Sequence, residues 1–257
     1  GAVLDAAAAR SPHLDGRPLC PGLVIQEMPG GSVFRHLRDG HRVAGGWAVS
    51  STGDGASLRA WRGDGARVLL FAGRQVATAE GMEVLSLLSD RPVPDGLPLP
   101  EAVSAVRAAG GIPVIPWGLG KWLLGRRRAL VAYLRGAELP LFLGDSGHRP
   151  RSWPEAGVFA AAAARGVLNL PGSDPLPLRG EEGRAGSLGF LADIDPDSPT
   201  PGHDLRRHLM SLRDQPPLVG NGRGWGPILR SQIALRLAKR RDGGGGNAAR
   251  DDREEQA

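Results

Sequence analysis

Cysteine is nearly absent from this 257-residue chain, which contains Cys20 alone. A single thiol excludes an internal disulfide framework and a thiolate metal cluster, and it is typical of a reducing compartment. The sequence also lacks an apolar run long enough for a transmembrane helix, and its N-terminus lacks the basic and apolar regions of a signal peptide. We therefore expect a cytoplasmic protein, although the absence of an initiator Met leaves a trimmed N-terminus open.

Lysine and aromatic residues are scarce as well. Only Lys121 and Lys239 occur, so arginine supplies almost all of the positive charge behind the formal net charge of +5. A nucleic-acid-binding domain usually concentrates basic residues on one face, with aromatic residues between them. Here the arginines are scattered among Asp and Glu, so we expect neither a nucleic-acid partner nor a membrane partner.

Histidine is too sparse for a typical multi-metal centre. Neither His-x-His nor His-Glu-x-x-His occurs, and such centres normally combine several imidazoles with carboxylates at strand ends. We therefore expect no resident metal ion and no other cofactor. The six histidines are His13, His36, His41, His148, His203 and His208.

Apolar runs alternate with helical patterns through the middle of the chain. We expect strands at 23–25, 46–50, 57–61, 67–72, 75–78, 83–88, 112–115, 139–143, 167–170 and 187–191, with a glycine turn at 73. We expect helices at 100–109, 121–135, 154–165, 203–212 and 227–241. This alternation is typical of a parallel sheet covered by helices, either a barrel or a doubly wound sheet.

The predicted organisation is one domain over residues 1–241. Residues 1–40 are irregular, because prolines interrupt them repeatedly. Residues 242–257 combine a glycine run with mixed charges and no large apolar side chain, so we expect a disordered tail.

Polar residues follow several of the expected strands. If the sheet is parallel, these residues converge at one end, where α/β proteins bind ligands. The alternative is that Asp and Gly simply occupy turns. Gly118-Leu119-Gly120-Lys121 resembles an anion cradle at a helix start, but it lacks the spacing of a nucleotide-binding P-loop.

The central motifs resemble one group of the PHP (polymerase and histidinol phosphatase) family over about residues 41–190. The matching segments, in order, are Gly73-Arg74-Gln75, Thr78-Ala79-Glu80-Gly81, Pro94-Asp95-Gly96-Leu97, Gly110-Gly111, Ile115-Pro116-Trp117 and Gly172-Ser173-Asp174. The resemblance implies an α/β fold, a distorted (β/α) barrel of the PHP type. It also implies metal-dependent phosphoesterase chemistry, with metal ligands at the carboxyl ends of the strands.

The chain departs from the family pattern at the metal ligands. Gln75 stands where the family has a metal-binding Glu, Trp117 where it has a His, and Leu176 where it has another His. Asp174 remains, with Asp54 and Glu83 as remnants. Because one or two carboxylates cannot hold a multi-metal centre, the resemblance argues against the family's usual reaction.

Three functional hypotheses follow. The leading one is a PHP-like barrel without the metal centre that binds a polar or anionic small molecule or acts as a scaffold, using Gln75, Trp117, Lys121, Arg149 and Asp174. The alternative is a residual phosphoester hydrolase that uses Asp174, Asp145 and His148, with a single divalent metal ion or by acid–base chemistry. The third is an interaction protein that binds acidic partners through the basic helix from Arg230 to Arg241.

Overall fold

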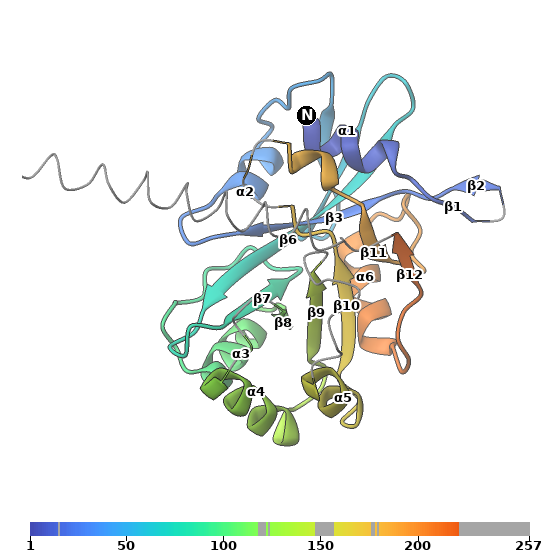
Figure 1. Ribbon diagram of the computed structural model, residues 1–257. Coiled ribbons are helices and arrows are strands. Elements are labelled where there is room, and N and C mark those ends of the chain that lie inside the picture. Colours follow the sequence, from blue (N-terminus) through green and yellow to red (C-terminus); the bar gives the residue numbers. More distant parts are fainter. Residues whose placement is uncertain are drawn as a thin grey trace, which may run out of the picture.

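The computed structural model of the chain describes residues 1–14, 16–117, 122, 124–146, 157–175, 178 and 180–220 (Figure 1). Its strands are β1 (His13–Leu14), β2 (Arg17–Pro18), β3 (Gly22–Glu27), β4 (Ala48–Ser51), β5 (Ser57–Trp61), β6 (Arg67–Ala77), β7 (Glu83–Leu87), β8 (Ile112–Pro116), β9 (Phe142–Ser146), β10 (Leu168–Gly172), β11 (Leu188–Phe190) and β12 (Leu218–Gly220). Its helices are α1 (Ala2–Ala9), α2 (Val33–Arg38), α3 (Leu99–Ala108), α4 (Leu124–Gly136), α5 (Gly157–Ala163) and α6 (Pro201–Ser211), with a 3₁₀ turn at Glu182–Arg184.

Eight strands form one central sheet of mixed direction. Seven of them lie in the order β10-β9-β8-β7-β6-β5-β4, and β3 pairs separately with β6. The pairs β3–β6, β8–β9 and β9–β10 are parallel, whereas β7 is antiparallel to both of its neighbours. Strands β3, β6, β8, β9 and β10 therefore run in the same direction, so their carboxyl ends lie at the same end of the sheet.

The sheet forks at the long strand β6. One edge of β6 pairs with β3 over residues 69–74, and the opposite edge pairs with β5 over 67–71 and then with β7 over 73–77. The predicted turn at Gly73 is absent, because this glycine lies within the strand. An added Cβ at Gly73 would lie 2.8 Å from Gln26 Oε1 and from Val24 Cγ1, so the missing side chain allows β3 to pack closely.

The predicted distorted (β/α) barrel is wrong, because the central sheet is open. Closure would require the segment near residues 187–191 to join the sheet edge. That segment forms β11, which instead pairs antiparallel with β12 in a separate two-stranded sheet. Strands β4 to β7 are also joined without intervening helices, so the protein is a mixed α/β fold dominated by its sheet.

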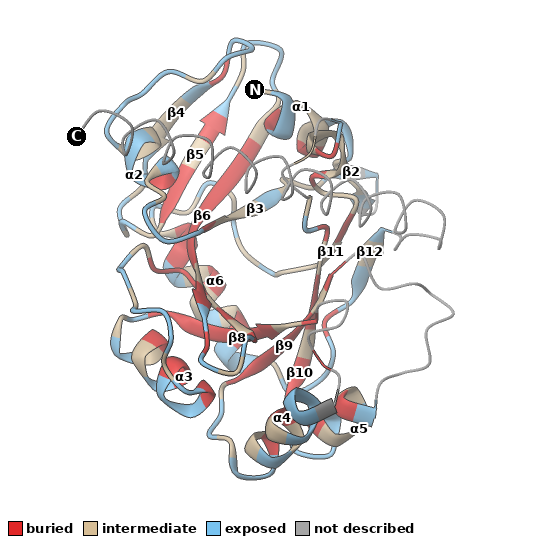
Figure 2. Ribbon diagram, turned by 60° about the vertical axis from the view of Figure 1, so that its left-hand side comes forward, coloured by how far each residue is buried: buried red, intermediate tan, exposed pale blue. Residues whose placement is uncertain are grey.

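Three apolar clusters hold the elements together. One face of the sheet is covered by α3, α4 and α5 and is called the outer face; the other is covered by α6 and is called the inner face. On the outer face, the three helices bury Val103, Leu130 and Val158 against Leu143 and its neighbours. On the inner face, α6 packs Leu205 and Leu209 against β6, β8, β9 and β10. A third cluster joins α1 and α2 to β5 and β6. Figure 2 shows that the buried segments are concentrated along the sheet strands, with α3, α4 and α5 on one side.

None of the helices in the described part of the chain has the length and apolar character that spanning a bilayer requires.

Candidate polar ligand site

The strand register decides which side chains share the inner face of the sheet. Residues paired across neighbouring strands point to the same face, and successive residues point to opposite faces. Val114 of β8 and Phe142 of β9 are paired and belong to the cluster beneath α6, which identifies the inner face. Ile115 and Leu143 are the next pair, and they belong to the outer cluster under the helices.

Three polar side chains lie on the inner face of the sheet, near the carboxyl ends of β3 and β6. Gln75 pairs with Leu85, whose side chain packs in the inner cluster, so Gln75 lies on this face. Glu83 lies two residues before Leu85 on the same side of β7. Gln26 pairs with Gly73 of β6, two residues before Gln75. The register therefore brings two amides and a carboxylate to one end of the inner face.

Gln26 carries a buried polar atom without a protein partner. Its Oε1 is inaccessible to solvent and forms no hydrogen bond within the described structure. Leaving a buried acceptor unpaired costs about 1–3 kcal/mol. Since most buried polar atoms are hydrogen-bonded, a bound group that donates to Gln26 would satisfy this atom once the amide turns to expose it.

At the same end of the inner face, β9 and β10 contribute small residues. Gly144 pairs with Pro116 and with Leu170, and Gly172 pairs with Ser146. An added Cβ at Gly144 would lie 3.1 Å from the Cα of Pro116. The amino-terminal half of this face is filled by large apolar side chains, whereas its carboxyl-terminal half combines glycines with polar groups.

Asp174 lies two residues beyond β10 at this end of the sheet, and its side chain is exposed. Its backbone φ is +41°, in the left-handed region that residues other than glycine rarely adopt. Such conformations are unfavourable and are concentrated at functional sites, so Asp174 stays a candidate ligand-binding residue.

The structure places Trp117 and Asp145 elsewhere. Trp117 is only 5 % exposed and packs in the outer cluster with Trp122, so its ring does not form an accessible wall. Asp145 pairs with Pro171 and lies on the outer-face side of β9, opposite to Gly144. Lys121, His148 and Arg149 lie outside the described residues, as does the helix expected at 227–241.

Asp54, which the sequence indicated as a remnant metal ligand, caps a helix instead. Its Oδ2 accepts hydrogen bonds from the backbone N–H groups of Gly202 at 2.6 Å and His203 at 3.2 Å, at the start of α6. Glu80 has an equivalent position at α3, where its Oε1 accepts the N–H of Leu99 at 3.0 Å. Both carboxylates therefore stabilise helix starts.

Hydrogen bonding also sets the charge state of Asp54. Burial alone raises the pKa of this carboxyl group, but hydrogen bonds from Ser57, Ala56, Gly202 and His203 outweigh burial and hold the pKa below its ordinary value of 3.8. The carboxylate is thus kept ionised by the groups that it caps.

Within the described ranges, no three or more His, Cys, Asp or Glu side chains are grouped so that they could hold a metal ion.

Sequence reasoning missed Gln26. Its signal was weak, because a single amide at the end of a short apolar run has no distinctive spacing. Only the parallel pairing of β3 with β6 brings Gln26 beside Gly73 and towards Gln75.

These elements define a mixed α/β protein with an open, forked sheet. Gln26, Gln75 and Glu83 form a polar strip on its inner face, at the carboxyl ends of the parallel strands. Neither known family profiles nor curated proteins match the chain. Among solved structures, it is similar to PsfC from Pseudomonas syringae PB-5123, with a TM-score of 0.54 and 15% sequence identity over 93% of this chain and 88% of that chain. At this identity the similarity extends to the fold alone, and the PHP resemblance stays a prediction.

Proposed function

We propose that the protein binds a small polar ligand at the carboxyl-terminal end of the inner face and lacks the multi-metal centre of the PHP phosphoesterases that its motifs resemble. The observation that carries the proposal is the unpaired, buried Oε1 of Gln26, on the face that Gln75 and Glu83 share. A ligand that donates a hydrogen bond would satisfy this acceptor.

The residue chemistry favours a particular ligand type. Amide and carboxylate oxygens accept hydrogen bonds, so Gln26, Gln75 and Glu83 suit hydroxyl or amino groups. The sequence adds Lys121 and Arg149, which would pair with an anionic group through charge-assisted hydrogen bonds. A phosphorylated polyol combines hydroxyl groups with an anionic group. Gln75 is neutral, so it lacks the charge with which a Glu would bind a metal ion.

Replacing Gln75 with leucine is expected to weaken binding of glycerol 3-phosphate by about tenfold, because a buried hydrogen-bonding group of the ligand would lose its partner. Isothermal titration calorimetry with glycerol 3-phosphate, glycerol and inorganic phosphate measures the effect and separates the two ends of the ligand. Gln215→Leu is the matched control, because Gln215 contacts the backbone N–H of Asn169 near the other end of β10. Equal affinity of the wild type and Gln75→Leu, or no saturable binding of any of the three probes, would contradict the proposal.

The second candidate is a residual phosphoester hydrolase, which the left-handed and exposed Asp174 favours. In this reaction Asp174 would hold a divalent ion or activate water, assisted by Asp145 and His148. Under our leading proposal we expect no hydrolysis of p-nitrophenyl phosphate with Mg²⁺, Mn²⁺ or Zn²⁺. Turnover that Asp174→Asn abolishes, and that the exposed control Asp64→Asn retains, would establish the hydrolase instead.

A further inference from the structure

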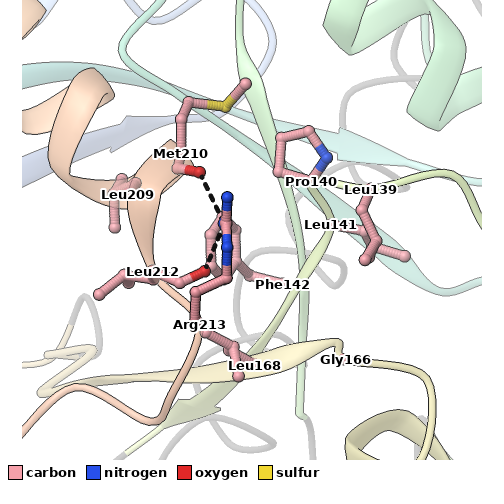
Figure 3. Close-up of a pocket in the computed structure, with 10 residues that line it drawn as sticks. All are labelled: Leu139, Pro140, Leu141, Phe142, Gly166, Leu168, Leu209, Met210, Leu212 and Arg213. Carbon is pink, nitrogen blue, oxygen red and sulfur yellow. Dashed lines mark hydrogen bonds between the residues drawn. The ribbon is translucent and has the colours of Figure 1, made fainter.

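A pocket of about 230 Å³ lies beside the starts of β9 and β10 and the end of α6 (Figure 3). The carboxyl ends of the parallel strands, with Gln26 and Gln75, lie at the opposite end of the sheet. Most of the pocket lining is aliphatic or aromatic, and one residue is charged. The lining residues are Leu139, Pro140, Leu141, Phe142, Gly166, Leu168, Leu209, Met210, Leu212 and Arg213.

Apolar side chains border the opening of the pocket to solvent. Leu139 is 54% exposed and Met210 is 47% exposed, so both present apolar surface at the edge of the pocket. Leu209, by contrast, is almost fully buried at 1% and belongs to the cluster beneath α6, so it forms the inner wall. Apolar side chains therefore border both the floor and the mouth of the pocket, beside polar backbone atoms and Arg213.

Arg213 supplies positive charge beside this apolar lining. Its Nη1 donates to the carbonyl oxygens of Met210 at 3.4 Å and Leu212 at 3.1 Å, which holds the side chain next to the pocket (Figure 3). No ion pair involving Arg213 is found within the described part of the chain. Its guanidinium group thus retains charge that a carboxylate could neutralise.

The combination points to an amphipathic ligand. A volume of about 230 Å³ accommodates about seven or eight groups of the size of a water molecule or a methylene. We propose that this pocket binds a medium-chain carboxylate of about six to eight carbon atoms, with its chain against Phe142, Leu168 and Leu209 and its carboxylate at Arg213. This site is independent of the polar strip and of the function proposed for it.

Calorimetry with octanoate, 1-octanol and octylammonium tests the proposal on the full chain. We expect saturable binding of octanoate, about tenfold weaker binding of 1-octanol and weaker binding still of octylammonium, because only the carboxylate pairs with Arg213. Arg213→Gln should reduce the octanoate affinity about tenfold and leave the 1-octanol affinity unchanged. Arg207→Gln is the matched control, because Arg207 is an exposed residue of α6 outside the lining.

A second variant locates the site independently of charge. Leu139→Gln should weaken octanoate and 1-octanol alike, and its exposed position favours normal folding, which circular dichroism checks. The proposal is overturned if octanoate does not bind saturably, or if neither Arg213→Gln nor Leu139→Gln weakens it. A concentration-dependent dimer that Leu139→Gln dissociates in sedimentation equilibrium would also overturn it, because a second copy would then occupy the mouth.

Discussion

Replacing Glu27 with alanine should lower the free energy of unfolding by about 3–5 kcal/mol, because it leaves a buried guanidinium without its counter-ion. Arg74 Nη1 lies 3.4 Å from Glu27 Oε2, and the two side chains are only 10% and 4% exposed. Chemical denaturation followed by circular dichroism measures the loss.

The network around this pair explains the size of the expected effect. Arg74 also donates to the carbonyl oxygens of Asp90 at 3.0 Å and Gly31 at 2.9 Å. Glu27 Oε1 accepts the backbone N–H of Phe34 at 2.7 Å, in the first turn of α2. One ion pair therefore joins the ends of β3 and β6 to α2 and to the loop after β7.

The double variant Glu27→Leu/Arg74→Met separates the ion pair from simple packing. Removing both charges together eliminates the uncompensated buried ion, so it should recover a large part of the stability that Glu27→Ala loses. Asp64→Ala is a suitable control, since the half-exposed Asp64 pairs with Arg62 at the surface. A loss below about 1 kcal/mol for Glu27→Ala would show that the pair is effectively solvated.

The sequence was most informative where local signals were strong. The strands predicted at 57–61 and 67–72 match β5 and the first part of β6, and the helix predicted at 100–109 differs from α3 by one residue at each end. Helices α1 and α2 were missed, because their region is interrupted by prolines and neither helix has a strong amphipathic period.

The global arrangement could not be derived in the same way. Alternating strands and helices left a barrel and a doubly wound sheet open, and the PHP resemblance predicted the closed form. The structure is open, because the three residues of β11 pair with β12. The fork at β6 depends on the parallel approach of β3 across Gly73, a contact between residues that are 47 apart in sequence. Such pairings are tertiary effects that local propensity does not encode.

The candidate site shows the same limit at single residues. Gln75 was predicted at the site and lies on the inner face. It is near the end of β6, and the pairing of β6 with β7 turns it to this face. Trp117 was predicted there too, but the alternation along β8 turns its ring outwards into the cluster beneath the helices. Residue identity predicted the chemistry at these positions, whereas the strand register decided which side chain could take part.

Asp54 is expected to be the most sensitive contact between the early and late parts of the chain. Asp54→Ala should destabilise the protein by about 2–4 kcal/mol, because it removes the helix cap and leaves buried donors without an acceptor. The carboxylate accepts Ser57 Oγ at 2.8 Å and Gly202 N–H at 2.6 Å, the latter 148 residues away in sequence. Helix α6 starts at this contact and covers the inner face, so loosening it should also weaken octanoate binding.

The pH dependence of stability provides a sharper test of Asp54. Because its folded-state pKa lies below the ordinary value of 3.8, the ionised group contributes stability above that value, and the contribution is lost as the pH falls through the lowered pKa. The difference in unfolding free energy between wild type and Asp54→Asn should therefore be large at neutral pH and shrink under strongly acidic conditions. Denaturation at several pH values measures it. A difference that stays constant between neutral and strongly acidic pH would show that hydrogen-bond geometry, and not the charge on the cap, holds α6 against the sheet.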